Sequence, residues 1–185
     1  MVQTASPNTG NNTNNYGYDP NGNLASSSDE NTHVTQTSFD LLYRMVQEVL
    51  PDGTLTETRN YDAAGNLTAL THFNGVTTSY TYDSLNRLLT RSTPGEPTVS
   101  FTYTATGKYA TSTAGDGTVT YTYDSMDRLV TKATPEGTLR YTYDAAGHVA
   151  SIASSNTNGA SVSYTYDDLD RLSTVVDHRL GSGSN

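Results

Sequence analysis

The stretch Tyr121-Thr122-Tyr123-Asp124-Ser125-Met126-Asp127-Arg128-Leu129 decides the fold of this chain, because close variants of it recur along the sequence. An aromatic residue, usually followed by aspartate, returns every 20 to 23 positions. A fixed period of this length indicates a repeat architecture in which each repeat contributes one supersecondary element. The eight aromatic anchors of these repeats are Tyr18, Phe39, Tyr61, Tyr82, Tyr103, Tyr123, Tyr143 and Tyr166.

Each repeat reads as strand, turn, strand, turn. A second aromatic residue stands two positions before the anchor in six of the eight repeats, and side chains two apart on a strand share a face. An apolar residue six positions after the anchor opens the next strand, and a second turn such as Asp52-Gly53 or Asn74-Gly75 follows. Four positions after the anchor, seven of the eight repeats have a residue suited to a turn, which is glycine at Gly22, Gly65, Gly107 and Gly147.

The predicted fold class is therefore all-β, a repetitive antiparallel β-hairpin meander that forms a coiled strip. We expect the anchor tyrosines to stack from repeat to repeat. Residues 39–50 also carry apolar residues at helical spacing, but the register of the repeat runs through them and we interpret them as strand.

Three segments are predicted along the chain. Residues 1–15 have no periodicity and are expected to be a mobile N-terminal segment, with an irregular cap as the alternative. Residues 16–176 hold the array of about eight hairpin repeats. Residues 177–185 form a C-terminal tail whose glycine and serine content is typical of a linker.

Composition narrows the classes of partner. The net charge of −9 repels a nucleic acid backbone, so we expect no nucleic acid partner. No stretch approaches the roughly 18 apolar residues of a membrane span, which predicts no membrane insertion. The chain has no cysteine, so neither disulfides nor thiolate metal sites are available.

The aspartates that follow the anchors are the first candidate site. Carboxylates at regular spacing could act in pairs in glycoside hydrolysis. We favour a structural interpretation, because an aspartate before a turn commonly accepts a backbone N–H. These turn-capping residues are Asp19, Asp40, Asp62, Asp83, Asp124, Asp144 and Asp167, and no catalytic residue is predicted.

A second polar set stands five positions after the anchors, with arginine at Arg44, Arg87, Arg128 and Arg171. The alternatives are an anion or sugar groove and a set of charge-assisted bonds to the neighbouring aspartates, and we favour the second.

No metal or other cofactor is predicted. The four histidines, His33, His72, His148 and His178, show no recurrent metal spacing. The run from Asp19 to Asn23 is similar to the start of a calcium loop, but the turn of the repeat already explains it.

The complete copies of the pattern, at residues 80–88, 121–129 and 164–172, resemble the YD repeat of the RHS-repeat family, and the resemblance covers residues 16–176. It implies a spiralling β-strip that closes into a hollow shell, as in bacterial polymorphic and insecticidal toxins, wall-associated proteins and teneurins. In the toxin members the shell encloses a C-terminal effector. The sequence holds no segment like the self-cleaving aspartyl-protease region of those members.

The resemblance implies a structural role, a segment of shell or scaffold in a secreted or cell-surface protein that is not an enzyme. Uncapped edge strands favour further repeats, or copies of the chain itself, as partners, including in filaments. The alternative function is a carbohydrate-binding or adhesion module that uses the tyrosines.

Overall fold

A computed structural model of the chain describes residues 2–5 and 13–179, and every regular element in them is a β-strand. This confirms the prediction of an all-β fold built from antiparallel hairpins. The strands are β1 (Val2–Ala5), β2 (Thr13–Tyr18), β3 (Leu24–Ser28), β4 (Val34–Phe39), β5 (Met45–Val49), β6 (Thr56–Tyr61), β7 (Leu67–Thr71), β8 (Thr77–Tyr82), β9 (Leu88–Ser92), β10 (Val99–Tyr103), β11 (Tyr109–Ala114), β12 (Gly117–Tyr123), β13 (Leu129–Thr134), β14 (Gly137–Tyr143), β15 (Val149–Ser154), β16 (Ser161–Tyr166) and β17 (Leu172–Asp177).

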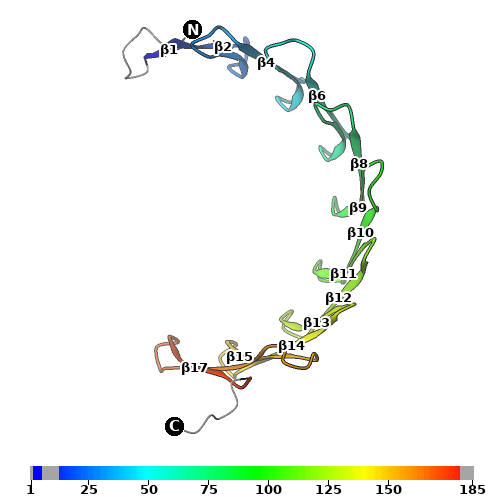
Figure 1. Cartoon of the computed structure of the whole chain (residues 1–185), viewed down its shortest axis with the longest axis vertical. Coiled ribbons are helices and arrows are strands. Elements are labelled where there is room, and N and C mark those ends of the chain that lie inside the picture. The colour runs from blue at the N-terminus through cyan, green and yellow to red at the C-terminus, as the bar shows by residue number, and fades with distance from the viewer. Residues whose placement is uncertain (1, 6–12, 180–185) are drawn as a thin grey trace. The chain divides into compact units, whose positions relative to one another are not determined.

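The chain divides into two compact parts, residues 1–97 and 98–185. In the N-terminal part, β1 to β9 pair with their neighbours in chain order, and all of these pairings are antiparallel. In the C-terminal part, β10 to β17 pair in the same way. Figure 1 shows the strands of each part following one another in sequence order. Each part is thus a hairpin meander.

The anchors mark the strand ends. Each of the eight anchors is the last residue of a strand, and the residue six positions later is the first residue of the next. Between them the chain makes a tight turn whose fourth residue after the anchor has a positive φ, for example Gly65 at 91° and Asp127 at 59°. The chain reverses where the sequence predicts it.

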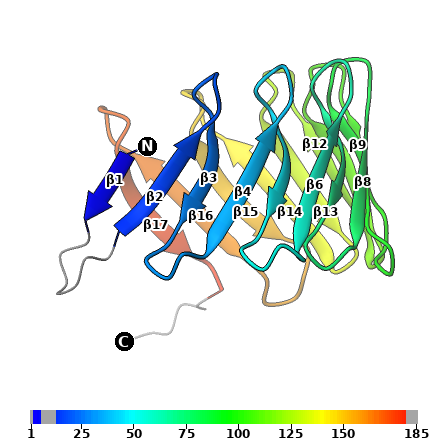
Figure 2. The ribbon, with the colours of Figure 1, turned by 90° about the horizontal axis from the view of Figure 1, so that it is seen from above.

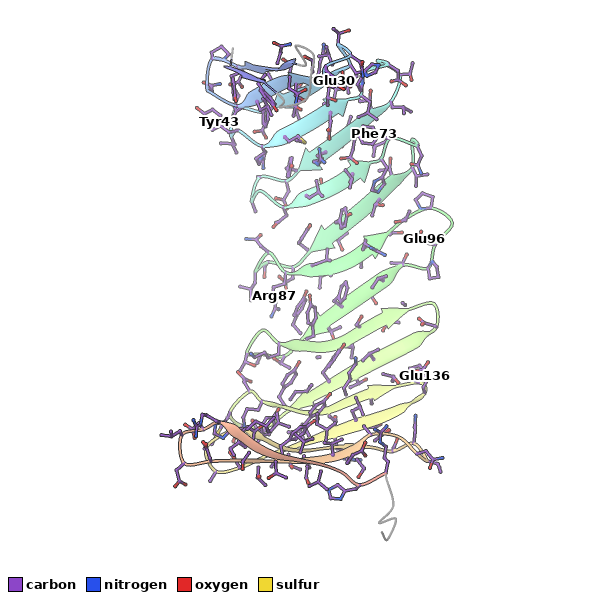
Figure 3. The ribbon with its side chains drawn as sticks, turned by 60° about the vertical axis from the view of Figure 1, so that its left-hand side comes forward. Glu30, Tyr43, Phe73, Arg87, Glu96 and Glu136 are labelled. Atoms are coloured by element: carbon purple, nitrogen blue, oxygen red, sulfur yellow. The ribbon has the colours of Figure 1, made fainter. Side chains whose placement is uncertain are left out.

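The two kinds of turn lie at opposite edges of the sheet. In the N-terminal part, the turns after β2, β4 and β6 lie along one edge (Figure 2). We call this the YD edge, and Figure 3 labels Tyr43 and Arg87 on it. The second turns form the other edge, where Figure 3 labels Glu30, Phe73 and Glu96.

The two faces of the sheet differ in chemistry. On one face hydroxyl side chains of paired strands bond to each other, with oxygen–oxygen distances of 2.7 Å for Thr122 and Thr131 and 2.6 Å for Thr81 and Thr90. The opposite face carries Tyr121, which pairs with Lys132 in the ladder. We call these the threonine face and the aromatic face.

Neither part has a conventional core. Among the described residues no hydrophobic side chain is buried, and the single buried residue is Thr78. A single-layer sheet buries side chains only against their neighbours on the same face, which explains why most strand residues are half-buried.

Strands extend into both terminal segments, residues 1–15 and 177–185. Val2–Ala5 form β1, and β2 begins at Thr13. β1 pairs with β2, because the edge of β2 would otherwise leave its backbone groups unpaired. Asp177 is the last residue of β17. Residues 1, 6–12 and 180–185 lie outside the described residues.

The strand interpretation of residues 39–50 is confirmed. β4 ends at Phe39, a turn follows, and β5 occupies Met45–Val49.

Candidate functional site

The aspartates after the anchors hold the turns together. One carboxylate oxygen of Asp83 accepts the backbone N–H groups of Leu85 and Arg87 at 2.9 and 3.0 Å, and the other accepts Nε of Arg87 at 2.7 Å. Asp40, Asp124 and Asp167 bind their arginines in the same way. Asp19 and Asp62 bind asparagine at the equivalent position, and Asp144 binds His148.

These bonds stabilise the charged form of each carboxylate. The side chain of Arg87 and then its backbone N–H lower the pKa of Asp83 below the ordinary aspartate value. For Asp124 the backbone N–H of Arg128 is the largest cause of a lowered pKa. A carboxylate held ionised in this manner is a poor general acid near neutral pH.

Arg44 and Arg128 also contact the next repeat. The Cζ atom of Arg44 lies 4.4 Å from the ring centroid of Tyr61, and the same distance separates Arg128 from the ring of Tyr143. This is the geometry of a cation–π contact. His148 takes the equivalent place over Tyr166, with ring centroids 4.4 Å apart.

The anchor hydroxyls form a second link between repeats. The hydroxyl group of Tyr61 donates to the carbonyl of Met45 at 2.9 Å, and that of Tyr143 donates to the carbonyl of Leu129 at 2.8 Å. Each acceptor is the first residue of the strand that precedes the anchor strand. Tyr82, Tyr123 and Tyr166 make the same bond to Leu67, Tyr109 and Val149.

Side chains that lie between neighbouring anchors connect them. Equivalent strands of neighbouring repeats are separated by an intervening strand, which places them about 9.6 Å apart, too far for ring contact. The ring contacts instead join Tyr109 to Phe101 and Tyr103, and Tyr166 to His148. The guanidinium or imidazole between two repeats provides the connection.

Two anchors depart from the pattern. Phe39 has no hydroxyl group to donate, and Thr104 replaces the aspartate after Tyr103. The hydroxyl of Thr104 still accepts the backbone N–H of Lys108 at 3.1 Å. The turn therefore keeps its form with a neutral cap.

Two hydrogen bonds between the turns of neighbouring repeats were not predicted from the sequence. The Asn66 amide donates to the side chain of Asn86 at 2.9 Å, and the Thr106 hydroxyl donates to Asp127 at 2.8 Å. The bridging residues stand three and five positions after their anchors, so they share no single column of the repeat. The one signal in the sequence is that the residue four positions after the anchor alternates between glycine and a larger residue such as Asn86 or Asp127.

The histidines make separate contacts. His33 binds Asp29 at 2.8 Å, and His178 binds Ser163 at 2.9 Å. No group of three or more metal-ligating side chains is arranged to hold an ion within residues 2–5 and 13–179. At the sequence similar to a calcium loop, both carboxylate oxygens of Asp19 accept bonds from the turn itself.

A shallow polar pocket lies at the second-turn edge of the aromatic face. Its lining includes Tyr80, Arg91 and Glu96, and beneath them the buried hydroxyl of Thr78 bonds to His72 at 3.2 Å and to Thr93 at 2.9 Å. The pocket thus brings an aromatic ring together with charged and hydroxyl groups.

Within the described ranges, no helix is long and apolar enough to cross a bilayer.

The arrangement defines the class of protein: an array of β-hairpins whose recurrent side chains couple one repeat to the next. The family model for the teneurin YD-shell matches residues 39–182, and that for the RHS repeat matches residues 18–55. The chain belongs to the teneurin YD-shell family, as the resemblance to YD repeats predicted.

Solved structures that contain TcdB2-TccC3 have the same fold. The crystal structure of TcdB2-TccC3-Cdc42 superposes with a TM-score of 0.71 at 20% identity, over 90% of this chain and 10% of that one. The structure of TcdB2-TccC3 without its hypervariable C-terminal region gives a TM-score of 0.72 at 20% identity, again over 90% and 10%. This chain thus spans about a tenth of the length of those chains. No curated protein matches it.

Proposed function

We propose that this chain is a structural segment of a shell or scaffold in a secreted or cell-surface protein, and that it associates with further repeats through its edge strands. The observation that carries the proposal is the use of the recurrent side chains. The aspartates, arginines and anchor tyrosines bond to their own turn or to the adjoining repeat. Side chains bonded in this way hold successive repeats together, as a structural segment requires.

The structural role can be tested by replacing the aspartates and measuring stability and hydrolysis. Asp83→Ala and Asp124→Ala should lower the melting temperature, and the wild-type chain should turn over none of a panel of chromogenic glycosides and esters. The contrary result is a wild-type hydrolysis rate that disappears in either variant while circular dichroism shows it still folded.

The association of edge strands is tested by sedimentation. Wild-type chain should form species larger than the monomer as its concentration rises, because an open edge strand offers unpaired backbone groups. Val175→Lys places a charge on the edge strand β17 and should reduce association, whereas Arg140→Lys in the interior strand β14 is the matched control. A wild-type chain that stays monomeric at high concentration contradicts this part of the proposal.

Carbohydrate binding is the second candidate function, and the pocket around Tyr80 favours it. Tyr80 pairs with Arg91 in the ladder, so a sugar ring stacked on the tyrosine would lie beside the guanidinium. Hits on a glycan array should be lost in Tyr80→Ala and Arg91→Ala and kept in Tyr121→Ala. An array without hits for the folded chain removes this candidate.

A further inference from the structure

The repeats alternate between two classes. At the fourth position after the anchor, every second repeat has glycine in a left-handed conformation, at Gly22, Gly65, Gly107 and Gly147. The repeats between them place a larger residue there, at Tyr43, Asn86, Asp127 and Asp170, also with positive φ. Each of the latter is followed directly by arginine, at Arg44, Arg87, Arg128 and Arg171. We call them Gly-class and Arg-class repeats.

The alternation of the two classes follows from a contact that the arginine of one repeat makes with the next repeat. The guanidinium of Arg44 lies over Tyr61 of the following Gly-class repeat, and its Nη1 lies 3.5 Å from the carbonyl of Asp62. A Cβ atom added to Gly65 would lie 3.8 Å from the same nitrogen, already in van der Waals contact, so a longer side chain would compete with the guanidinium for this space. Arg128 and Gly147 repeat this geometry at 3.8 Å. An Arg-class repeat is therefore shaped to receive a Gly-class repeat.

The last repeat carries the same arginine without its cover. Arg171 binds Asp167 at 2.7 Å as the other arginines bind their aspartates. Its side chain is 71% exposed, however, against 27% for Arg44 and 29% for Arg128. Leu172, which opens β17, is 56% exposed.

The strand next to Arg171 is open as well. Within the described residues β17 pairs on one side, with β16, and two of its apolar residues, Val175 and Val176, are 54% and 43% exposed. The edge thus presents backbone groups, an uncovered cation and apolar side chains together. Arg44 and Arg128 are each covered by a following Gly-class repeat, and the same kind of repeat would cover these groups at the β17 edge.

We propose that the β17 edge is a docking site for a β-hairpin of the Gly class, that is, one whose anchor tyrosine is followed four positions later by glycine. This inference rests on the proposed structural function and names the partner of that edge. The first strand of the hairpin pairs antiparallel with β17, its anchor ring lies under the guanidinium of Arg171, and its anchor hydroxyl donates to the carbonyl of Leu172. Glycine at the fourth position leaves the guanidinium in place.

The test uses the full chain and a labelled peptide of residues 137–154, a Gly-class hairpin of this protein, closed by a disulfide between cysteines added at its ends. The peptide should bind, measured by fluorescence anisotropy, and should slow hydrogen exchange of the β17 amides. Arg171→Ala should weaken binding about 3- to 10-fold, in line with the loss of one cation–π contact. Arg171→Lys should have a smaller effect, and Arg140→Ala, an exposed residue on the threonine face, should have none.

Changes in the peptide test the other half of the contact. Tyr143→Ala and Gly147→Leu in the peptide should each reduce binding to the wild-type chain. Self-association of the chain that competes with the peptide and is weakened by Arg171→Ala supports the same contact with a second copy as donor.

The inference is overturned if the folded chain does not bind the peptide, or if Arg171→Ala binds it as tightly as wild type. Either result would leave the structural function standing, because that function depends on the contacts within the array. A catalytic activity found in the folded chain would overturn the proposed function and leave the docking measurement intact.

Discussion

At the scale of single residues, the turn at the YD edge is decided by backbone conformation and by one carboxylate. A left-handed residue is needed to join the two strands, and glycine adopts it without the steric cost that other residues meet. The aspartate then bonds to the backbone N–H groups that the turn leaves unpaired. Together these two positions explain why the pattern survives changes at the residues between them.

Tyr43 is the turn residue with the largest side chain at the left-handed position, with φ at 62° and the ring 58% exposed. Tyr43→Gly should stabilise the chain by roughly 0.5–1 kcal/mol, because it removes most of the left-handed penalty. This corresponds to a rise in melting temperature of about 1–4 °C. Tyr43→Ala keeps the penalty and is the matched control; an equal rise in both variants would contradict the conformational explanation.

The aspartates make stability depend on acid. Their folded-state pKa values are lowered, so the unfolded chain takes up protons before the folded chain does as the pH falls. The stabilising contribution is present above the ordinary aspartate pKa of about 3.9 and is lost as the pH falls through the lowered values. Melting temperatures should be nearly constant from pH 7 to 5 and should fall below about pH 4. A melting temperature that rises between pH 5 and 3 would have the opposite sign and refute this explanation.

At the scale of strands, the hydroxyl groups of five anchors bond the strand that carries the anchor to the strand before it. β14 is joined to β13 in this way by Tyr143 and the carbonyl of Leu129, beside the ordinary ladder. Since no hydrophobic residue of the described chain is buried, such bonds and the cross-strand pairs carry a large share of the cohesion.

Tyr143→Phe should therefore destabilise the chain by about 1 kcal/mol, the usual net value of a hydrogen bond of this kind. Tyr141→Phe removes a hydroxyl from the same strand, two residues earlier on the same face, and should change stability by far less. Urea denaturation of both variants measures the difference. Equal losses would mean that the phenol ring, and not its bond to Leu129, decides the contribution.

At the scale of the whole molecule, the structural unit of the array is a pair of repeats, one of the Gly class and one of the Arg class. An Arg-class repeat reaches forward to a tyrosine, and a Gly-class repeat reaches forward from its turn tip to the side chain of Asn86 or Asp127. Two consecutive repeats of one class would break this order. Stability of such arrays is close to a sum over repeats and their interfaces, so interface errors are measurable.

Deletion of residues 61–81 removes one Gly-class repeat and places Asn86 next to Arg44. Deletion of residues 39–81 removes one repeat of each class and keeps the alternation. We expect the smaller deletion to give the lower melting temperature and the broader transition, although it leaves more of the chain, because it creates a mismatched interface. If the transition temperature simply followed the number of repeats, the two-repeat unit would be refuted.

The sequence by itself determined the strands and the turns, because both depend on local conformation. The aromatic anchors end their strands, the apolar residues six positions later begin the next, and Gly22, Gly65, Gly107 and Gly147 between them have positive φ. Residues 39–50 could be assigned to strand in spite of their mixed spacing, because the repeat register passes through them.

Only the tertiary structure shows which repeat each of these side chains contacts. The polar set at Arg44 and Arg128 could have bonded only within its turn, but the pairing of β5 with β6 and of β13 with β14 carries the guanidinium over the next tyrosine. Asn66 and Thr106 were not singled out, since their partners lie 20 and 21 residues away. Contacts of this kind depend on strand register and side-chain reach across neighbouring hairpins, and no local pattern of residues specifies either.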